Sequence, residues 1–198
     1  MIYIVSFLIA YLIAAINPAI VLSKKVLKQD IRNLGSKNAG TTNAIRTMGK
    51  GIGALVFVLD LLKVVISYGI ICIIGFVFKA DISSSVKSLY MLASVLGHSY
   101  PVYYGFKGGK GVAVFLMSAI VVDAKIAAIC ILIGVIIIAI SRMVSLGSMV
   151  GSLSLIIIDI FFATNYSFWI ALITVVVVIY NHRENISRIL AGKENKLF

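Results

Sequence analysis

The sequence has few of the residues that build disulfides and metal centres. Its 198 residues include only two cysteines, two histidines and seven acidic side chains. Cys72 and Cys130 each lie inside an apolar run, at a spacing that fits neither a disulfide nor a metal site. We therefore expect both thiols to act as small apolar side chains, and we expect no metal site.

Polar sequence is also scarce, because 61% of the residues are hydrophobic and the mean hydropathy is +1.10. No soluble domain of this size needs so much apolar surface, whereas each bilayer crossing takes about 20 apolar residues. The apolar runs are continuous, as in Ile126–Ile140, and not alternating as in a membrane β-barrel. The sequence thus indicates an all-α, polytopic integral membrane protein with a single domain over residues 1–198.

About seven apolar segments are expected to cross the membrane. In chain order, the expected helices are Ile2–Leu22, Gly51–Phe78, Ser88–Leu96, Val112–Val122, Ile126–Ile140, Met143–Ala163 and Phe168–Tyr180. Asn17-Pro18 is expected to kink the first of them. The charged turn Asp123-Ala124-Lys125 favours two short helices over one bent helix between residues 112 and 140. The tail, Asn181–Phe198, is polar with a helical pattern.

The formal net charge of +11 is explained better by membrane topology than by nucleic-acid binding. With seven crossings and the N-terminus outside, fourteen lysines and arginines fall in cytoplasmic segments and three fall outside. No basic residue precedes the first apolar run, which argues for a retained first helix rather than a cleaved signal peptide. We expect the C-terminus and three polar segments to lie on the cytoplasmic face.

The first polar segment, Gly35–Arg46, combines small residues, hydroxyls and amides with one arginine. Such a donor-rich surface suits an oxyanion. A turn followed by a helix cap, with Arg46 anchored to lipid headgroups, explains the composition equally well.

The second polar segment, Gly97–Val112, holds five glycines, His98 and two lysines three residues apart, Lys107 and Lys110. Backbone N–H groups and ammonium groups together favour phosphate binding. The segment is not a Walker A loop, because Gly111 stands where Ser or Thr should follow the lysine. A flexible glycine loop with interfacial lysines is the alternative.

The third polar segment runs from Asn181 to Glu194. On a helix, Asn181, Glu184, Asn185 and Arg188 share one face, while isoleucines and a leucine share another. An amphipathic tail on the membrane surface is the alternative to a site. His182 is a candidate general base, although a lone histidine is more often a structural donor.

Asp60 and Lys63 are expected inside the second helix, at positions i and i+3. Charged residues in a membrane segment are candidates for a functional role. We expect an internal ion pair that holds helices together more than a catalytic pair.

The three segments together resemble the motifs of the bacterial acyl-phosphate:glycerol-3-phosphate acyltransferase family. The family's first motif, about GSxNxGxTNxxR, is matched by Gly35, Ser36, Asn38, Gly40, Thr42, Asn43 and Arg46. The second, about GHxxPVxxxFKGGKGVA, is matched by Gly97, His98, Pro101, Val102 and Phe106–Ala113. The third, about HRxNIxRLLxGxE, is matched by His182, Arg183, Asn185, Ile186, Arg188, Leu190, Gly192 and Glu194.

The resemblance implies transfer of a fatty acyl group from acyl phosphate to the 1-hydroxyl of glycerol 3-phosphate, giving lysophosphatidic acid and phosphate. It implies a multi-pass protein of the bacterial inner membrane that works in phospholipid synthesis with the enzyme that makes acyl phosphate. Because the donor is already activated, we expect no cofactor, and no nucleic-acid partner is expected.

Two groups of site residues are expected from these motifs. The catalytic candidates are Ser36, His98, Lys110, Asn181, His182 and Glu184. The phosphate-binding and substrate-binding candidates are Gly35, Asn38, Thr42, Asn43, Arg46, Lys107, Gly108, Gly109, Gly111 and Asn185. In this hypothesis Lys107, Lys110 and the Gly108-Gly109 N–H groups hold the donor phosphate. The acceptor of the hydroxyl proton stays open between His98, His182, Glu184 and a substrate phosphate oxygen.

Three other interpretations remain. A covalent acyl-enzyme at Ser36 lacks a partner base at a recognisable spacing. A small anion or phosphate-ester transporter would use basic loops too, but its polar residues usually lie at mid-membrane depth on several helices. A structural membrane anchor leaves the three polar segments unexplained.

Overall fold

The computed structural model describes residues 1–162 and 164–196, and these residues form helices without a strand. In chain order the helices are α1 (Ile2–Ala14), α2 (Pro18–Val26), the 3-10 helix η1 (Ile31–Asn33), α3 (Thr41–Val77), α4 (Ser84–Ser99), the 3-10 helix η2 (Val102–Tyr104), α5 (Val112–Val122), α6 (Ala124–Ser141), α7 (Val144–Phe161), α8 (Phe168–Asn181) and α9 (Arg183–Leu190). The predicted all-α fold is confirmed. The expected helix end at Ala163 and the last two tail residues lie outside the described residues.

The predicted first helix is two helices, because Asn17-Pro18 breaks the chain instead of only kinking it. Pro18 has no N–H and disfavours helical geometry in the residue before it, so it begins α2. The Asn17 side chain caps α2 by accepting a hydrogen bond from the Ile20 N–H at 3.1 Å. Its amide also donates to the Ala39 carbonyl at 3.1 Å, which ties the helix break to the first polar segment.

Helix α3 begins at Thr41, ten residues before the predicted start at Gly51. Gly49 interrupts it with φ +85° and ψ 168°, a backbone conformation that favours glycine. Residues 41–48 therefore form a separate helical segment that folds back toward the long part of α3. The two parts meet at Gly53, where a β-carbon would lie 2.8 Å from the Ile45 nitrogen.

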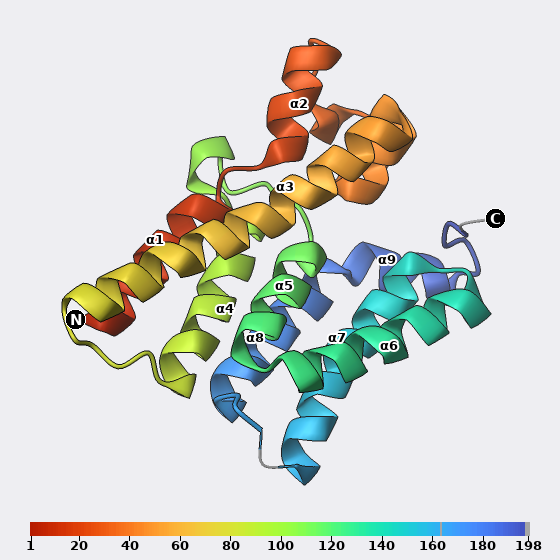
Figure 1. The fold of residues 1–198 in the computed structure, drawn as a ribbon. Coiled ribbons are helices and arrows are strands. Elements are labelled where there is room, and N and C mark those ends of the chain that lie inside the picture. The colour runs from red at the N-terminus through yellow and green to blue at the C-terminus, as the bar shows by residue number, and fades with distance from the viewer. Residues whose placement is uncertain (163, 197–198) are drawn as a thin grey trace.

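Helix α4 lies at the centre of the bundle and packs against α1, α5 and α8 (Figure 1). It extends beyond the predicted Ser88–Leu96 at both ends. One apolar cluster joins α4 to α1 and α3 through residues such as Ala10, Val64 and Tyr90. A second cluster joins its other side to α5–α8. These contacts hold the C-terminal end of α4, which carries His98, between the two halves of the chain.

Helices α5 and α6 are separate, as predicted from the charged turn between them. The Asp123 side chain caps α6 by accepting hydrogen bonds from the N–H groups of Lys125 and Ile126 at 3.1 and 3.2 Å. Helices α6 and α7 then pack closely, because Gly134 and Gly147 leave no room for a β-carbon between the two backbones.

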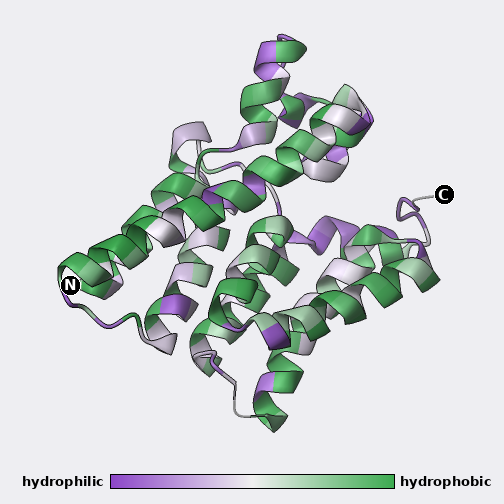
Figure 2. Cartoon of the chain, in the orientation of Figure 1, coloured by the Kyte–Doolittle hydropathy of each residue, from purple (hydrophilic) through white to green (hydrophobic). Residues whose placement is uncertain are grey.

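Four segments of the described chain are long and apolar enough to cross a membrane: Ile2–Val26, Thr41–Val77, Ala124–Ser141 and Val144–Phe161. Helices α5 and α8 are apolar but shorter. Figure 2 shows that apolar residues cover most of the long helices, whereas α9 is strongly hydrophilic. The count of seven crossings stays a prediction.

Candidate active site

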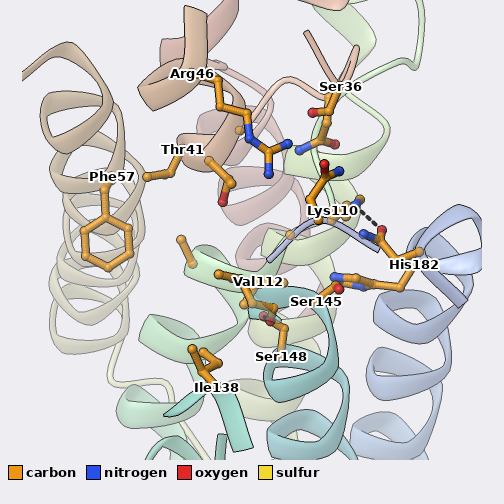
Figure 3. Close-up of a pocket in the computed structure, with 18 of the residues that line it drawn as sticks. Ser36, Thr41, Arg46, Phe57, Lys110, Val112, Ile138, Ser145, Ser148 and His182 are labelled. Atoms are coloured by element: carbon orange, nitrogen blue, oxygen red, sulfur yellow. Dashed lines mark hydrogen bonds between the residues drawn. The ribbon is translucent and has the colours of Figure 1, made fainter. Parts of the chain in front are cut away.

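The three polar segments meet in one pocket of about 340 Å³. Figure 3 shows Ser36, Arg46, Lys110 and His182, which come from all three segments, with their side chains around this space. Sequence-predicted residues that line it are Ser36, Asn38, Thr42, Arg46, His98, Lys110, Gly111, His182 and Asn185. The segments are separated in sequence by two long apolar stretches, so only the tertiary fold brings them together.

Asn43 organises the first polar segment from within and does not line the pocket. It is fully buried, and its amide nitrogen donates to the carbonyls of Leu34 and Asn38 at 2.9 and 3.0 Å. The side-chain oxygen of Asn43 accepts a hydrogen bond from the Ser36 N–H at 2.9 Å. Gly35 is required beside it, since its φ is +53° and a β-carbon would overlap the Asn43 oxygen. Both residues thus hold the loop that presents Ser36, rather than contacting a ligand in the pocket.

The central loop folds back onto the end of α4 through main-chain hydrogen bonds. The Gly108 N–H donates to the Ser99 carbonyl at 3.0 Å, and the Gly109 N–H donates to the His98 carbonyl at 3.2 Å. The prediction that these two N–H groups hold a phosphate was therefore wrong, because both donors are already used. The glycines serve close packing instead: a β-carbon at Gly109 would overlap His98 Nε2 and lie 2.7 Å from the Ala39 carbonyl oxygen.

The two lysines of the central loop have different surroundings. Lys110 is half-buried in the pocket wall and donates a hydrogen bond to the Asn185 side-chain oxygen, drawn dashed in Figure 3. Burial, and next the positive charge of Arg188, lower the pKa of Lys110 to about 8, so it stays mostly protonated at pH 7. Lys107 is exposed and does not line the pocket, contrary to the prediction.

The third segment closes the pocket through Glu194, a residue of the third motif that is not among the predicted site residues. Its carboxylate accepts from the Ser145 hydroxyl and the Asn185 amide at 2.7 Å each and from Arg188 Nε at 2.8 Å. Burial alone would raise the pKa of Glu194, but these hydrogen bonds hold it below its ordinary value. The predicted acid Glu184 is exposed on α9 and lies outside the pocket lining, because α9 turns its face with Asn185 inward.

Both histidines are buried and line the pocket. His182 Nδ1 lies 2.8 Å from the Val178 carbonyl oxygen, which can only accept, so Nδ1 carries a proton. Burial lowers the pKa of His182 to about 4, and the ring is neutral at pH 7 with an unprotonated Nε2. His98 Nδ1 instead lies 2.9 Å from Lys63 Nζ.

Asn181, predicted as catalytic, supports the pocket from outside its lining. Its side-chain oxygen accepts from the Tyr100 hydroxyl at 2.7 Å, and its amide lies 3.5 Å from the Lys110 carbonyl. Sequence reasoning missed Ser145 and Ser148, which begin α7 and line the pocket beside Glu194. No local signal identifies them, since serines at i and i+3 in an apolar helix are usually structural.

The other wall of the pocket is apolar. It is formed by Phe57 on α3, Val112, Ala113 and Leu116 on α5, and Ile138 and Val144 on α6 and at the start of α7. Figure 3 shows Phe57 on one side of the space, with Val112 and Ile138 across from it. Phe57 is 39% exposed, and Leu55 and Val58 beside it on α3 are exposed as well, so the apolar wall adjoins an exposed apolar helix surface. The site therefore pairs a cationic end with an apolar flank.

Comparison with known proteins agrees with this geometry. Residues 4–192 match the family model described as Glycerol-3-phosphate acyltransferase. The chain belongs to this family. A glycerol-3-phosphate acyltransferase of Thermoanaerobacter pseudethanolicus is 40% identical over 96% of this chain and 93% of its own length. One of Aquifex aeolicus is 40% identical over 94% of this chain and 95% of its own length.

The glycerol-3-phosphate acyltransferase fold is shared with a solved structure. The crystal structure of PlsY (YgiH), an integral membrane glycerol 3-phosphate acyltransferase, in its glycerol 3-phosphate form, superposes with a TM-score of 0.85. It is 37% identical and covers 99% of this chain and 96% of its own. The lysphosphatidic acid form of that enzyme gives a TM-score of 0.82 at 36% identity, over 99% of this chain and 95% of its own. The chain is therefore a multi-pass member of an integral membrane acyltransferase family.

Proposed function

We propose that this protein transfers a fatty acyl group from acyl phosphate to the 1-hydroxyl of glycerol 3-phosphate, giving lysophosphatidic acid and phosphate. One observation carries the proposal: a single pocket joins a cationic wall from three polar segments to an apolar wall. The reaction needs both, because two substrates carry phosphate and one also carries an alkyl chain. The glycerol 3-phosphate and lysphosphatidic acid forms of the PlsY structure support the acceptor and the product.

Acyl phosphate suits this pocket as the donor, since phosphate is its leaving group and the mixed anhydride is already activated. Lys110 and Arg188 are the cations nearest to the Asn185–Glu194 network and are assigned to the donor phosphate. The Lys110 ammonium offsets the charge that develops on the leaving group. The acyl chain then lies along Phe57, Leu116 and Ile138.

Arg46 is assigned to the phosphate of glycerol 3-phosphate, with Ser36 and Asn38 beside it. No carboxylate pairs with Arg46 in the part of the chain that the structure describes, so its guanidinium is available for a ligand. Figure 3 shows the Arg46 side chain extending into the pocket near Ser36 and Thr41. A cation at each end of the polar wall would keep the two phosphates apart and leave the reacting groups between them.

The transfer is written as direct attack. The 1-hydroxyl oxygen bonds to the acyl carbonyl carbon, the bond from that carbon to the bridging phosphate oxygen breaks, and phosphate leaves with the electron pair. The hydroxyl proton goes to a phosphate oxygen. His182 is a weak base with a pKa of about 4, so its Nε2 orients the hydroxyl by accepting a hydrogen bond. Glu184 lies outside the pocket lining and is not a candidate base.

An acyl-enzyme at Ser36 is less well supported. In the described part of the chain neither histidine hydrogen-bonds to the Ser36 side chain, and no other base does. A serine hydroxyl without a partner base is a weak nucleophile.

The topology proposed from charge places this pocket on the cytoplasmic side of the bacterial inner membrane, with seven crossings and the N-terminus outside. Figure 1 supports it: Met1 lies at the end of the bundle where α3 ends, whereas α2 and α9 lie at the opposite end. The Tyr3 hydroxyl, 3.4 Å from the Ser83 hydroxyl just before α4, fits the same arrangement. A cytoplasmic pocket would receive acyl phosphate from the enzyme that makes it.

The test is release of phosphate from acyl phosphate by the purified protein in lipid nanodiscs, with and without glycerol 3-phosphate. We expect release that depends on the acceptor, with lysophosphatidic acid as the lipid product. Lys110→Ala should lower turnover about 100-fold or more, as removal of one charged transition-state contact does elsewhere. Lys25→Ala, an exposed lysine on α2, is the control.

Wild-type turnover in Lys110→Ala at saturating substrate would show that the phosphate assignment is wrong. A protein that moves phosphate esters across vesicle membranes without forming lysophosphatidic acid would be a transporter instead.

A further inference from the structure

A buried charged cluster lies directly behind the pocket, on the interface of α3 with α4. Lys63 Nζ is 2.8 Å from Asp60 Oδ1 and 2.9 Å from His98 Nδ1. The three side chains are 1–7% exposed, and Asp60 and His98 also line the pocket. The two charges predicted within the second helix are thus more than an ion pair within one helix: they contact a histidine of the site.

Three acceptor atoms surround the Lys63 ammonium, two of them hydrogen-bonded to it and the third, Asp60 Oδ1, paired with it by charge. Besides Asp60 and His98, Lys63 donates at 3.0 Å to the Ile16 carbonyl. That carbonyl is free because the chain breaks at Asn17-Pro18, where the next turn of helix would otherwise have bonded it. The break before α2 therefore supplies one of the three oxygen and nitrogen acceptors that fix the position of the ammonium.

This arrangement leaves one consistent protonation state for His98. A negative Asp60, a positive Lys63 and a neutral imidazole sum to zero charge, which a buried site favours. His98 Nδ1 also lies 3.4 Å from Asp60 Oδ1, but the Lys63 ammonium is nearer at 2.9 Å, and an Nδ1–H would face that cation, which has no lone pair to accept it. Nδ1 is therefore the acceptor, and the proton of the ring is on Nε2.

The protonated nitrogen lies on the pocket side of the ring. His98 Nε2 is in contact with Gly109, where a β-carbon would overlap it, and Gly109 is next to Lys110. In the described part of the chain no group accepts a hydrogen bond from Nε2. The imidazole thus presents an unused donor beside the ammonium that is assigned to the donor phosphate.

We propose that Asp60 and Lys63 are positioning residues that lock His98 as the Nε2–H tautomer, so that it donates a hydrogen bond to a substrate oxygen held beside Lys110. The site then contains two neutral histidines of opposite tautomer. His98 donates through Nε2, and His182, whose Nδ1–H is bonded to Val178, accepts through Nε2. The substrate oxygen rests on the proposed function and is the acyl carbonyl or a phosphoryl oxygen of the donor.

This assignment gives His98 a role that differs from that of a general base. Its only lone pair is bonded to the Lys63 ammonium, so the ring cannot take the proton of the attacking hydroxyl. A donor fixed before the substrate arrives stabilises charge as it develops on oxygen without reorganisation. Loss of the lock should therefore lower kcat more than it raises KM.

The direct test is nitrogen NMR of the full-length protein in nanodiscs with 15N-labelled histidine. The sequence has only two histidines, so the spectrum has two imidazoles, and His98→Asn assigns them. We expect both rings to be neutral at pH 7, with the proton on Nε2 of His98 and on Nδ1 of His182. An Nδ1–H or imidazolium signal from His98 would overturn the proposal, and this readout does not depend on activity.

The kinetic test uses the double variant Asp60→Asn/Lys63→Met, which removes both charges and leaves neither one buried alone. We expect kcat to fall about tenfold to 100-fold with KM changed less than threefold, and the His98 nitrogen signals to lose their single-tautomer pattern. Tyr90→Phe is the control, since it removes buried hydrogen bonds between the same two helices, α4 and α3, one turn of α3 away from Lys63.

The NMR and kinetic experiments distinguish failure of this proposal from failure of the proposed function. Absence of acyltransfer in the wild type, with the expected tautomers present, would refute the function and leave the lock standing. Active wild type with a double variant as active as Tyr90→Phe would refute the lock alone.

Discussion

The two loops that form the cationic wall of the pocket are held in place by different means. The first polar segment wraps around the side chain of Asn43, whose amide bonds to backbone groups of four residues. In the described structure none of the central loop's own side chains plays this part, and its backbone bonds directly to the end of α4 through Gly108 and Gly109. One loop therefore depends on an amide that is present, and the other on β-carbons that are absent.

This difference explains why Gly108, Gly109 and Asn43, each predicted to bind substrate, instead bond to or pack against the protein's own backbone. In each loop the residues with the strongest sequence signal maintain the backbone, whereas the ligand-facing groups are the side chains carried beside them, Ser36 and Lys110. Substitutions that act on one loop and not on the other test whether the two loops are held in these different ways.

The largest effect is expected for Gly109→Ala. A methyl group there overlaps His98 Nε2 and approaches the Ala39 carbonyl, so His98 and the backbone that carries Lys110 must shift. We expect kcat/KM for acyltransfer to fall about 100-fold or more, because displacing catalytic groups by about 1 Å has effects of that size. Gly69→Ala, at a helical glycine with open space around it, is the control and should keep wild-type activity. Activity within threefold of wild type would mean that the close contact is dispensable.

Asn43→Ala tests the other loop. It removes the donor to the Leu34 and Asn38 carbonyls and leaves the Ser36 N–H without its acceptor. Buried groups left unpaired cost about 1–3 kcal/mol, so we expect a lower thermal midpoint together with a roughly tenfold rise in KM for glycerol 3-phosphate. Differential scanning fluorimetry and initial-rate kinetics measure the two effects. Asn165→Ala, which removes one exposed hydrogen bond from a side-chain amide to Asp123, should change neither the thermal midpoint nor KM.

The Lys110 ammonium gives the central loop a pH dependence. Because its pKa is about 8, the cation is present below pH 8 and is lost as pH rises through that value. We expect kcat/KM to fall about tenfold per pH unit above 8, as for any single required protonated group.

Lys110→Arg checks this assignment, since a guanidinium also stays charged above pH 8. We expect the variant to have lower activity at pH 7 but a flat profile between pH 7 and 9.5. A basic limb of unchanged position in the variant would assign the titration to another group.

Most of the fold could be predicted from the sequence, because its apolar runs and charged turns mark the helices directly. Asp123 fixes the boundary between α5 and α6. The predicted first residues of α5, Val112, and of α8, Phe168, agree with the structure. The largest errors lie where one residue changes the backbone: Pro18 splits the first helix, and Gly49 allows the helical segment 41–48 to precede the long part of α3.

The candidate active site could be predicted from the sequence only in part. Ordered motifs identify which segments meet, but no local pattern shows which way a side chain faces. Glu184 and Asn185 are adjacent, yet only Asn185 enters the pocket, because a step of one residue on a helix turns the side chain by about 100°. Ser145 and Glu194 meet across 49 residues, a contact that only the packing of α7 against the tail creates.

The smallest effect is expected where the two loops are joined to each other. Arg32, in η1 just before the first polar segment, donates to the Tyr104 and Lys107 carbonyls at 2.7 and 3.0 Å while it is paired with Asp30. The Arg32 hydrogen bonds lower the pKa of Asp30 to about 2, so this stabilisation is complete above pH 4 and is lost only as pH falls toward 2.

At pH 7, Arg32→Gln should therefore destabilise the protein by about 1 kcal/mol, since the pair is partly exposed, and raise KM for both substrates about twofold to threefold. Lys24→Gln is the matched control, because Lys24 contacts the same carboxylate at 3.6 Å but touches neither loop. Equal effects of the two substitutions would assign the stabilisation to the Asp30 charge. A larger effect of Arg32→Gln on both KM values assigns the stabilisation to the hydrogen bonds with the Tyr104 and Lys107 carbonyls. It also shows that Arg32 holds the central loop against the segment that leads into the first polar segment.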